Sequence, residues 1–341
     1  MAATTIKEIA RQLNISVSTV SRALHNHKSI GLRTRTRVQE LAAALHYEPN
    51  QRAIFFQQQK TFTLGVILPA LSEAFFAAAI SGIEDMANTN NYTVLMGQSH
   101  DSAEREKKIV ATMKKHQVDG IIVSLAKDAV NIDHFTQLAK HDIPVVFFDR
   151  VPDNAEAHYV ACDMEAGTIE AIDFLLKKKY RVIAMINGPQ QLLASKQRTE
   201  GYRQAMDKHR IKYDPALIIH SDLSKEGTYA AMEQLLKGKR KPQAIVTFND
   251  YVLLDAIQYA RKQNIAINEE IVFVSYANLP FGAHTAFPPL ASLEQYPYQQ
   301  GQQATTLLLD LLQKTREERR TTAFKHIVIA PALVINETIH K

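Results

Sequence analysis

Basic side chains are concentrated at the N-terminus of the 341-residue chain. Residues 1–60 contain nine Lys or Arg against three Asp or Glu, a net charge of +6, whereas residues 61–341 contain 31 against 32, a net charge of −1. Ammonium and guanidinium groups gathered in this way attract polyanions and pair with phosphate oxygens. The first sixth of the chain is therefore predicted to bind a polyanion, and the rest to form a nearly neutral body.

Three short helices are expected to position these basic groups. Thr5 and Ser16 precede apolar stripes and can cap helices that begin at residues 6 and 17. A third apolar stripe covers residues 38–45, and Pro49 ends the bundle because proline disfavours helical geometry in the residue before it. Short helices joined by a tight turn form a helix-turn-helix module. We therefore expect a helix-turn-helix domain over residues 1–49 and a linker over residues 50–60.

No constellation of catalytic residues accompanies this module. The chain lacks the motifs G-x-x-x-x-G-K-[ST], G-x-G-x-x-G, G-x-S-x-G and H-E-x-x-H. His25 and His27 lie close together but lack further metal ligands nearby in the sequence. The sequence predicts no enzyme activity, no cofactor and no metal.

A single cysteine and the absence of targeting signals indicate the compartment. Cys162 stands in an apolar context, where a buried structural thiol is favoured over an activated nucleophile. The first residues do not resemble a signal peptide, and no apolar run approaches the roughly 20 residues needed to span a bilayer. We expect a cytoplasmic protein without membrane association.

The body of the chain has an α/β pattern. Short apolar runs, interpreted as strands, alternate with amphipathic segments, interpreted as helices, from Thr63 to residue 274. Such alternation predicts largely parallel, doubly wound sheets. About 270 residues exceed one such sheet, so we expect two lobes with a cleft between them. Lobe 1 is placed at about residues 61–161 and 293–321, and lobe 2 at about residues 162–292 and 322–341.

Sequence motifs continue along the whole chain in a fixed order. They are Thr5-Ile-Lys-Glu-Ile-Ala10, Ser16-Val-Ser-Thr-Val-Ser-Arg-Ala-Leu24, Thr63-Leu-Gly-Val-Ile-Leu-Pro69, Val118-Asp-Gly-Ile-Ile-Val123, Phe148-Asp-Arg150, Arg198-x-x-Gly201-Tyr202 and Asn249-Asp250. In these motifs and their spacing the chain resembles the LacI/GalR repressor family. The resemblance implies a transcription regulator, in which a helix-turn-helix domain is followed by a sensor domain like the periplasmic sugar-binding proteins.

The resemblance implies roles for polar residues around the second helix. Val17, Ser18 and Arg22 are expected to reach base edges in the major groove, and Arg22 can grip guanine in a bidentate manner. Phosphate contacts are expected from a larger set of residues, namely Thr5, Ser16, Thr19, Ser21, Asn26 and Thr34. Each hydroxyl could instead cap a helix or face solvent. Arg33, Arg35 and Arg37 could form only a solvated helix face.

The linker of the family folds into a hinge helix on DNA and inserts an apolar side chain into the minor groove. Phe56 occupies this position here, where Leu is usual, and Phe is a known wedge residue. Ile54 replaces a common Arg, which weakens the expected phosphate contact of the hinge. An alternative is that Phe55 and Phe56 pack against the partner hinge.

Effector binding is expected in the cleft, between polar groups and aromatic faces of both lobes. Arg198 has a planar fork that can hold vicinal hydroxyls or a carboxylate, unless it forms only a surface salt bridge. Asp149 and Asp250 could accept hydroxyl protons or act as strand-end caps. The complete predicted set is Phe75, Phe76, Asp149, Arg150, Arg198, Asn249, Asp250, Asn278 and Gln295.

Departures from the family pattern bear on the effector. Ala277 replaces a common ligand-binding Asp, and Leu192 and Ala194 replace polar residues that contact purines. A purine is therefore disfavoured, and a mono- or oligosaccharide is predicted. The chain stops soon after Leu333-Val334 without apolar heptads, so we expect a homodimer on a pseudo-palindromic operator, with an affinity that the effector changes allosterically.

Two other classes of protein explain only part of the chain. A free sugar-binding protein would account for residues 61–341 but not for the basic N-terminal region. An architectural DNA-binding protein would account for the basic region but not for a body with a cleft.

Overall fold

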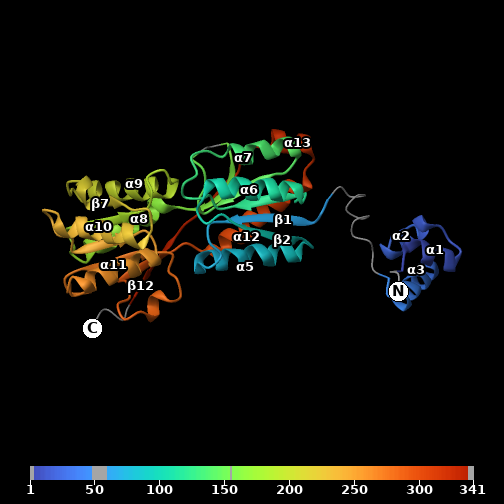
Figure 1. Cartoon of the computed structure of the whole chain (residues 1–341), viewed down its shortest axis with the longest axis horizontal. Coiled ribbons are helices and arrows are strands. Elements are labelled where there is room, and N and C mark those ends of the chain that lie inside the picture. The colour runs from blue at the N-terminus through green and yellow to red at the C-terminus, as the bar shows by residue number, and fades with distance from the viewer. Residues whose placement is uncertain (1–3, 48–59, 154–155, 337–341) are drawn as a thin grey trace. The chain divides into compact units, whose positions relative to one another are not determined.

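The computed structural model describes residues 4–47, 60–153 and 156–336. The chain divides into two compact units between Thr61 and Phe62 (Figure 1). The first unit is helical, and the second contains two parallel sheets flanked by helices. Each unit is described by itself.

The N-terminal unit is a bundle of α1 (Ile6–Leu13), α2 (Val17–Leu24) and α3 (Leu32–Ala44). Thr5 caps α1 by accepting the Glu8 N–H, and Ser16 caps α2 by accepting the Thr19 N–H. Asn14 ends α1 in the left-handed conformation, at φ 52°. The apolar stripes meet in a small core of Ile9, Ala10, Val20, Ala23, Val38 and Ala42. The caps and stripes thus produce the helix-turn-helix that the sequence predicts.

Lobe 1 of the second unit is built on a six-stranded parallel sheet in the order β11-β5-β4-β3-β1-β2. The strands are β1 (Thr63–Leu68), β2 (Thr93–Gln98), β3 (Gly120–Val123), β4 (Val145–Phe148), β5 (His158–Cys162) and β11 (His326–Ile329). The helices are α5 (Ala74–Thr89), α6 (Ala103–Lys115), α7 (Asp133–Thr136), α12 (Pro297–Gln313) and α13 (Arg316–Thr321), with the 3-10 turn η1 (Gln137–His141).

Lobe 2 repeats the arrangement in the order β12-β10-β9-β8-β6-β7, with only β12 antiparallel to its neighbour. The strands are β6 (Ile183–Asn187), β7 (Ile218–His220), β8 (Ala244–Thr247), β9 (Val272–Tyr276), β10 (Ala291–Glu294) and β12 (Ala332–Ile335). The helices are α8 (Met164–Lys177), α9 (Leu193–Lys208), α10 (Lys225–Lys237) and α11 (Asp250–Lys262), with the 3-10 turns η2 (Pro215–Leu217) and η3 (Gly282–His284).

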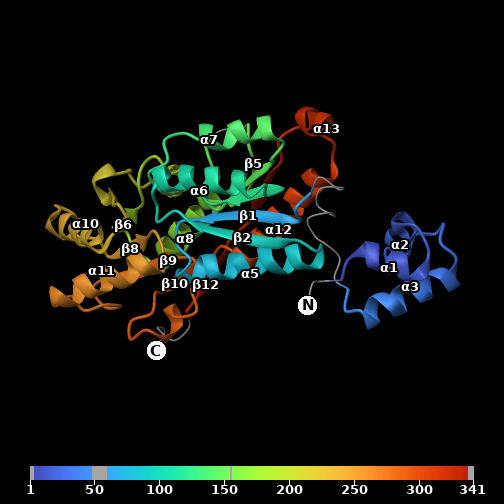
Figure 2. The ribbon, with the colours of Figure 1, turned by 45° about the vertical axis from the view of Figure 1, so that its right-hand side comes forward.

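Both faces of each sheet are buried, which makes the architecture doubly wound. Helices α5 and α12 lie on one side of the lobe 1 sheet, and α6 and α7 lie on the other (Figures 1 and 2). In β1, Val66 packs in the cluster with α5 and α12, whereas Ile67 packs in the cluster with α6 and α7. Adjacent strand residues point to opposite faces, so apolar runs without alternation are the signature of such strands. At the crossing of α5 and α12, a Cβ on Gly301 would come within 2.2 Å of the Ala79 carbonyl oxygen. Only glycine permits this close approach.

The chain crosses between the lobes three times, after β5, after β10 and after β11. The expected lobe boundaries need correction at the last two crossings. Residues 326–329 form β11 on the edge of the lobe 1 sheet, although we expected residues 322–341 in lobe 2. Strand β10 lies wholly in lobe 2, although residues 293–294 were expected in lobe 1. Strand β11 belongs to lobe 1 because it pairs with β5, and β10 belongs to lobe 2 because it pairs with β9 and β12. Such pairing is a tertiary contact that no local sequence pattern predicts.

Candidate functional site

The exposed face of α2 carries the three residues expected to read bases. Val17 is 40% exposed, which is unusual for an apolar side chain, and Ser18 and Arg22 are also exposed. Ser18 and Arg22 are four residues apart, so they lie on the same side of the helix. No hydrogen bond within the described chain occupies the Arg22 guanidinium, so it can make new contacts.

The residues expected to contact phosphates differ in their surroundings. The Ser16 hydroxyl accepts the Thr19 N–H at 3.1 Å and lies 2.8 Å from the hydroxyls of both Ser18 and Thr19. Thr5 accepts the Glu8 N–H at 3.4 Å, and Asn26 accepts from Gln39 at 2.9 Å. Ser16, Thr5 and Asn26 are exposed despite these bonds, whereas Thr19, Ser21 and Thr34 are half-buried. Capping and DNA contact are compatible for the exposed members.

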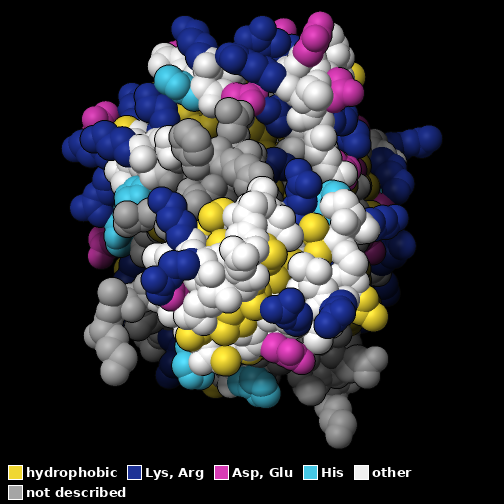
Figure 3. Space-filling view, turned by 90° about the vertical axis from the view of Figure 1, so that its right-hand side faces the viewer, with side chains coloured by type: hydrophobic (Ala, Val, Ile, Leu, Met, Phe, Trp, Pro, Cys, Tyr) yellow, Lys and Arg dark blue, Asp and Glu magenta, His cyan; other side chains and the backbone are white. Residues whose placement is uncertain are grey.

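The third helix adds basic groups to the same unit. Arg33 and Arg37 are exposed, whereas Arg35 is half-buried and donates to the Ile30 carbonyl oxygen at 3.2 Å. Gly31 precedes α3 and gives no side-chain cap. Figure 3 shows Lys and Arg side chains (dark blue) spread over the face in view. Phe56 and the other expected linker residues up to residue 59 lie outside the described residues.

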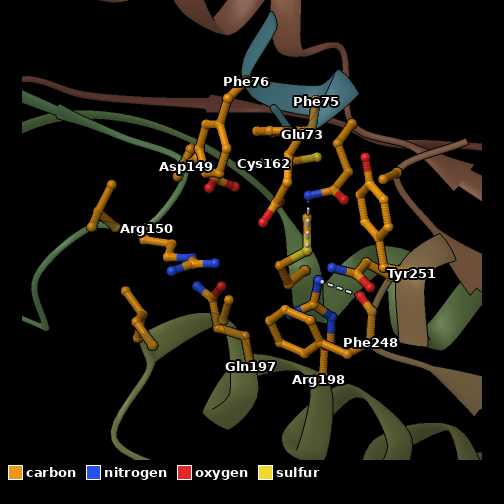
Figure 4. A pocket seen from close by; sticks show the side chains of 18 of the residues that line it. Glu73, Phe75, Phe76, Asp149, Arg150, Cys162, Gln197, Arg198, Phe248 and Tyr251 are labelled. Atoms are coloured by element: carbon orange, nitrogen blue, oxygen red, sulfur yellow. Dashed lines mark hydrogen bonds between the residues drawn. The ribbon is translucent and has the colours of Figure 1, made fainter. Parts of the chain in front are cut away.

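A pocket between the two lobes gathers most of the predicted effector-binding residues (Figure 4). Seven of the nine line it, namely Phe75, Phe76, Asp149, Arg150, Arg198, Asn249 and Gln295. Asp149 follows β4, Asn249 follows β8 and Gln295 follows β10. The pocket therefore lies at the carboxyl ends of parallel strands, which is where open α/β sheets bind ligands.

Arg198 is the best-defined charged group of the pocket. It extends from α9, is only 3% exposed, and its guanidinium carbon lies 4.1 Å from the ring centroid of Phe248 and 4.3 Å from that of Tyr276. Its Nη2 donates to the Phe248 carbonyl oxygen at 3.4 Å. Its Nε and Nη1 have no hydrogen-bond partner among the described residues. Burial lowers the pKa of Arg198, and a buried donor without an acceptor is costly unless a ligand satisfies it.

Arg150 faces Arg198 from the other lobe (Figure 4). Its guanidinium pairs with Asp101, which also accepts the Lys127 N–H at 3.1 Å. The guanidinium carbon lies 5.9 Å from the ring centroid of Phe76. Asp101 thus fixes Arg150 at the edge of an aromatic face.

Two carboxyl groups of the pocket are half-buried. Burial raises the pKa of Asp149, and the positive charges of Arg150 and Arg198 oppose this shift. The Ser124 hydroxyl donates to Asp149 at 3.2 Å. Burial also raises the pKa of Glu73, against the charge of Arg150. The lining thus carries two carboxyl groups beside two guanidinium groups.

Asp250 and Asn278 require a correction, because neither lines the pocket between the lobes. Asp250 is 1% exposed and accepts the Leu279 N–H at 2.6 Å, so it acts as a structural cap. Asn278 donates to Glu294 at 3.0 Å. Both line a separate cavity in lobe 2. Asn249 is the N-cap of α11 and lines the pocket between the lobes, whereas Asp250 is the first residue of that helix and lines the other cavity.

Several lining residues were not predicted from the sequence. They are chiefly Glu73, Cys162, Gln197, Phe248 and Tyr251. Glu73 and Tyr251 each lie within two residues of a predicted site residue, and this proximity was the available signal. Burial raises the pKa of Cys162 to about 12, so its thiol is protonated at neutral pH and is not an activated nucleophile.

Hydrogen bonds join the lobes on either side of the pocket. The Ala74 N–H donates to the Tyr251 hydroxyl at 3.2 Å. Elsewhere Lys127 donates to the Asp222 carbonyl oxygen at 2.8 Å, and Gln191 donates to the Lys127 carbonyl oxygen at 2.9 Å. The lobes are thus in contact, and the free volume of the pocket is only about 50 Å³.

Within the described part of the chain, no group of three or more His, Cys, Asp or Glu could hold a metal ion. No helix among the described residues is long and apolar enough to cross a membrane.

Comparison with known proteins matches both units. Residues 61–330 match the family model of periplasmic binding proteins and the sugar binding domain of the LacI family, and residues 5–50 match that of bacterial regulatory proteins, lacI family. The HTH-type transcriptional repressor CytR of Escherichia coli (strain K12) is 29% identical over 313 residues, covering 91% of this chain and 90% of the relative. The catabolite control protein A of Priestia megaterium is 27% identical and covers 94% and 96%.

Solved structures agree on the fold. A transcriptional regulator CelR–cellobiose complex has a TM-score of 0.72 at 24% identity and covers 98% of this chain and 99% of that chain. The lac repressor dimer bound to operator and the anti-inducer ONPF has a TM-score of 0.81 at 20% identity and covers 99% of each chain.

A helix-turn-helix unit followed by a two-lobed domain with a pocket between its lobes defines a DNA-binding transcription regulator with a sensor domain. With both family models matched over nearly its whole length, the chain belongs to the LacI family of bacterial regulatory proteins.

Proposed function

We propose that this regulator is a cytoplasmic, non-catalytic homodimeric repressor that binds a pseudo-palindromic operator and responds to an uncharged sugar. Arg198 carries the proposal for the effector, because two of its buried donor groups remain unsatisfied between two aromatic rings. Hydroxyl oxygens of a sugar would accept from these donors, and its apolar ring face would pack on aromatic side chains.

The charge of the pocket favours a neutral effector over a phosphate ester. Glu73 and Asp149 offset Arg150 and Arg198, and Asp101 already pairs with Arg150. An anionic group held by either arginine would lie beside these carboxyl groups, which disfavours it. Ala194, one of the two residues that replace expected polar contacts to a purine, lines the same pocket and supports a saccharide over a purine; the other, Leu192, does not line it. The similar CelR was solved in complex with cellobiose.

On the DNA side, Val17, Ser18 and Arg22 are proposed to read bases in each half-site. The exposed hydroxyl and amide groups of Thr5, Ser16 and Asn26, together with Thr19, Ser21 and Thr34, are proposed to fix the helix on the phosphate backbone. Two copies of the chain would place two such helices on opposite halves of the operator. The lac repressor was solved as a dimer on its operator, and this chain has the same fold.

The proposed allosteric step is a change in lobe closure. An effector held by Arg150 of lobe 1 and Arg198 of lobe 2 stabilises one relative orientation of the lobes. The pocket is too small for a sugar while the lobes are in contact as described, so the lobes must separate to admit it. The resulting coupling to DNA affinity would be about 1–3 kcal/mol, and DNA would affect effector binding reciprocally.

A thermal-shift screen against sugars and nucleosides tests the proposal. A saturating effector stabilises the folded protein by about 2.7 kcal/mol at a hundredfold excess over Kd. Each hit is retested with Arg198→Ala and then with operator DNA. A sugar hit that disappears in the variant and changes operator affinity supports the proposal. If only nucleosides or phosphorylated compounds shift the transition, the effector assignment is wrong.

A further inference from the structure

A second cavity lies within lobe 1, apart from the pocket between the lobes. It is bounded by α7, η1, the starts of β4 and β5, the end of α12 and α13, and it shares no lining residue with the pocket between the lobes. Figures 1 and 2 show α7 and α13 on the same side of lobe 1. The cavity holds about 380 Å³, which is a volume typical of small-molecule sites.

The floor of this cavity is apolar. Phe135, Ile143, Phe147 and Leu311 are buried in the lobe 1 core and line it, and Phe324 lines it while remaining 48% exposed. The apolar surface that stays exposed in this cavity, including that of Phe324, gains free energy when an apolar body covers it.

His158 also lines the cavity but adds no positive charge to it. Burial lowers the pKa of this imidazole to about 4, so the ring is neutral at neutral pH. Its Nδ1 accepts the Lys325 N–H at 3.1 Å. The basic character of the cavity therefore comes from elsewhere.

Helix α13 presents three arginines to the cavity. Arg316, Arg319 and Arg320 stand at positions i, i+3 and i+4, so they share one face of the helix, and all three line the cavity. The capping box of Thr315 and Glu318 fixes the start of the helix: Glu318 accepts the Thr315 N–H at 2.7 Å. The acidic Glu318 is thereby turned toward the backbone and does not line the cavity.

Only one of the three arginines pairs with a carboxylate among the described residues. Arg319 pairs with Asp142 at 2.6 Å and donates to the carbonyl oxygens of Leu311 and Lys314, each at 3.1 Å. Arg316 donates to the Lys140 carbonyl oxygen at 3.2 Å but pairs with no carboxylate among the described residues.

Arg320 is exposed and has no hydrogen-bond or ion-pair partner within the described chain. Like charges four residues apart on a helix repel each other, so the fold gains nothing from Arg316 and Arg320 together. The acidic lining consists of Asp142, which Arg319 neutralises, and Glu156. The rim therefore keeps an excess of positive charge.

We propose that this cavity is a second ligand site, which binds a small amphipathic organic anion. The apolar body of the anion lies against Phe135, Phe147 and Phe324, and its carboxylate or phosphate monoester is held by Arg316 and Arg320. Guanidinium groups bind both kinds of oxyanion in a bidentate manner. The site is independent of the proposed effector pocket between the lobes.

The test titrates full-length protein with 4-phenylbutyrate and phenyl phosphate by ligand-observed NMR. Two controls lack one feature each: 4-phenylbutyramide has no charge, and glucose 6-phosphate has no apolar body. We expect both amphipathic anions to bind at least about tenfold more tightly than the controls. The stronger of the two anions identifies the preferred head group.

Substitutions in and around the cavity test whether the anions bind there. The double variant Arg316→Gln/Arg320→Gln, which leaves the Arg319 anchor intact, is expected to weaken binding by about tenfold or more. Ala139→Trp fills the cavity from its exposed edge and is expected to abolish binding. The matched control Lys107→Gln/Lys108→Gln removes two exposed charges of α6 outside the cavity and should have no effect.

Three results would overturn the proposal. The first is that neither amphipathic anion binds at about 10 mM. The second is that the folded double arginine variant binds the anions as tightly as the unmodified protein does. The third is that Arg198→Ala loses binding, which would place the probe between the lobes. Thermal unfolding of each variant establishes that it is folded.

Discussion

The guanidinium carbon of Arg198 lies 4.1 Å from the ring centroid of Phe248, and Nη2 of the same arginine donates to the Phe248 carbonyl oxygen at 3.4 Å. Phe248, at the end of β8, thus supplies both the aromatic ring that stacks on Arg198 and the carbonyl oxygen that accepts its hydrogen bond. A Cβ on Gly188 would come within 2.6 Å of this ring, so glycine lets the ring lie close to the backbone after β6. The arginine is held in position before any ligand arrives.

Arg198→Lys is expected to weaken effector binding by about tenfold to a hundredfold, or about 1.4–2.7 kcal/mol. Lysine keeps the charge but loses the planar fork and the stacking on Phe248. Calorimetric titration with the effector identified by thermal shift measures the change. Arg203→Lys, an exposed position on the same helix, is the control. Unchanged affinity in Arg198→Lys would refute the role of the guanidinium.

Arg22→Ala is expected to cost about 1–3 kcal/mol of operator binding and to relax specificity at one base pair of each half-site. Operator and random DNA are compared by fluorescence anisotropy. Arg11→Ala removes an exposed arginine that pairs with Glu8 on α1, and should affect both DNAs far less. An equal loss on both DNAs in Arg22→Ala would make Arg22 a phosphate contact instead.

Tyr251→Phe removes the acceptor of the Ala74 N–H and hence one hydrogen bond between the lobes. The net loss of about 0.5–1.5 kcal/mol should shift free protein toward open lobes and, because the pocket must open to admit an effector, strengthen effector binding by about two- to tenfold. Small-angle scattering of free protein reports the opening. Tyr229→Phe on α10, which loses a hydrogen bond to Gln258, is the control. Weaker binding without a change in scattering would mean that the hydroxyl touches the effector directly.

His158 makes the folded state sensitive to acid. Its folded pKa of about 4 lies below the ordinary value of 6.5, chiefly because of burial. The neutral ring therefore contributes stability that is fully present above pH 6.5 and is lost as the pH falls toward 4. The contribution is about 1–2 kcal/mol once partial solvent screening is allowed for.

His158→Asn retains an acceptor for the Lys325 N–H but does not titrate. Urea unfolding at several pH values should therefore show a smaller loss of stability in the variant between pH 6.5 and 4. Parallel curves for the two proteins would exclude His158 as the titrating group.

Local sequence signals accounted for the elements with strong caps or uninterrupted apolar runs. Thr5 and Ser16 predicted the starts of α1 and α2, and eight apolar runs correspond to β1–β4 and β6–β9. Helix α12 was not predicted, because Gly301 and several glutamines in its first half resemble a loop. Gly301 is needed because α12 approaches the backbone of α5 closely, and this packing contact cannot be predicted from local sequence.

The edge strand β11 could not be predicted from local sequence signals either. Strand β11 pairs in register with β5, from Ile329 opposite Cys162 to His326 opposite Tyr159, across more than half of the body of the chain. At the site, strand ends predicted where polar residues gather but not which way each side chain points. Asn249 and Asp250 differ by one position and face different cavities.

The three crossings between the lobes also constrain synthesis. Lobe 1 begins at Phe62, yet it receives α12 and β11 only after lobe 2 has been almost completely translated. The lobe 1 sheet lacks β11 until the ribosome has passed Ile329, and the lobe 2 sheet lacks β12 until it has passed Ile335. A nascent chain therefore exposes open strand edges in both lobes at once. Truncation before residue 326 would leave both sheets one strand short, so the two lobes should be lost together rather than in turn.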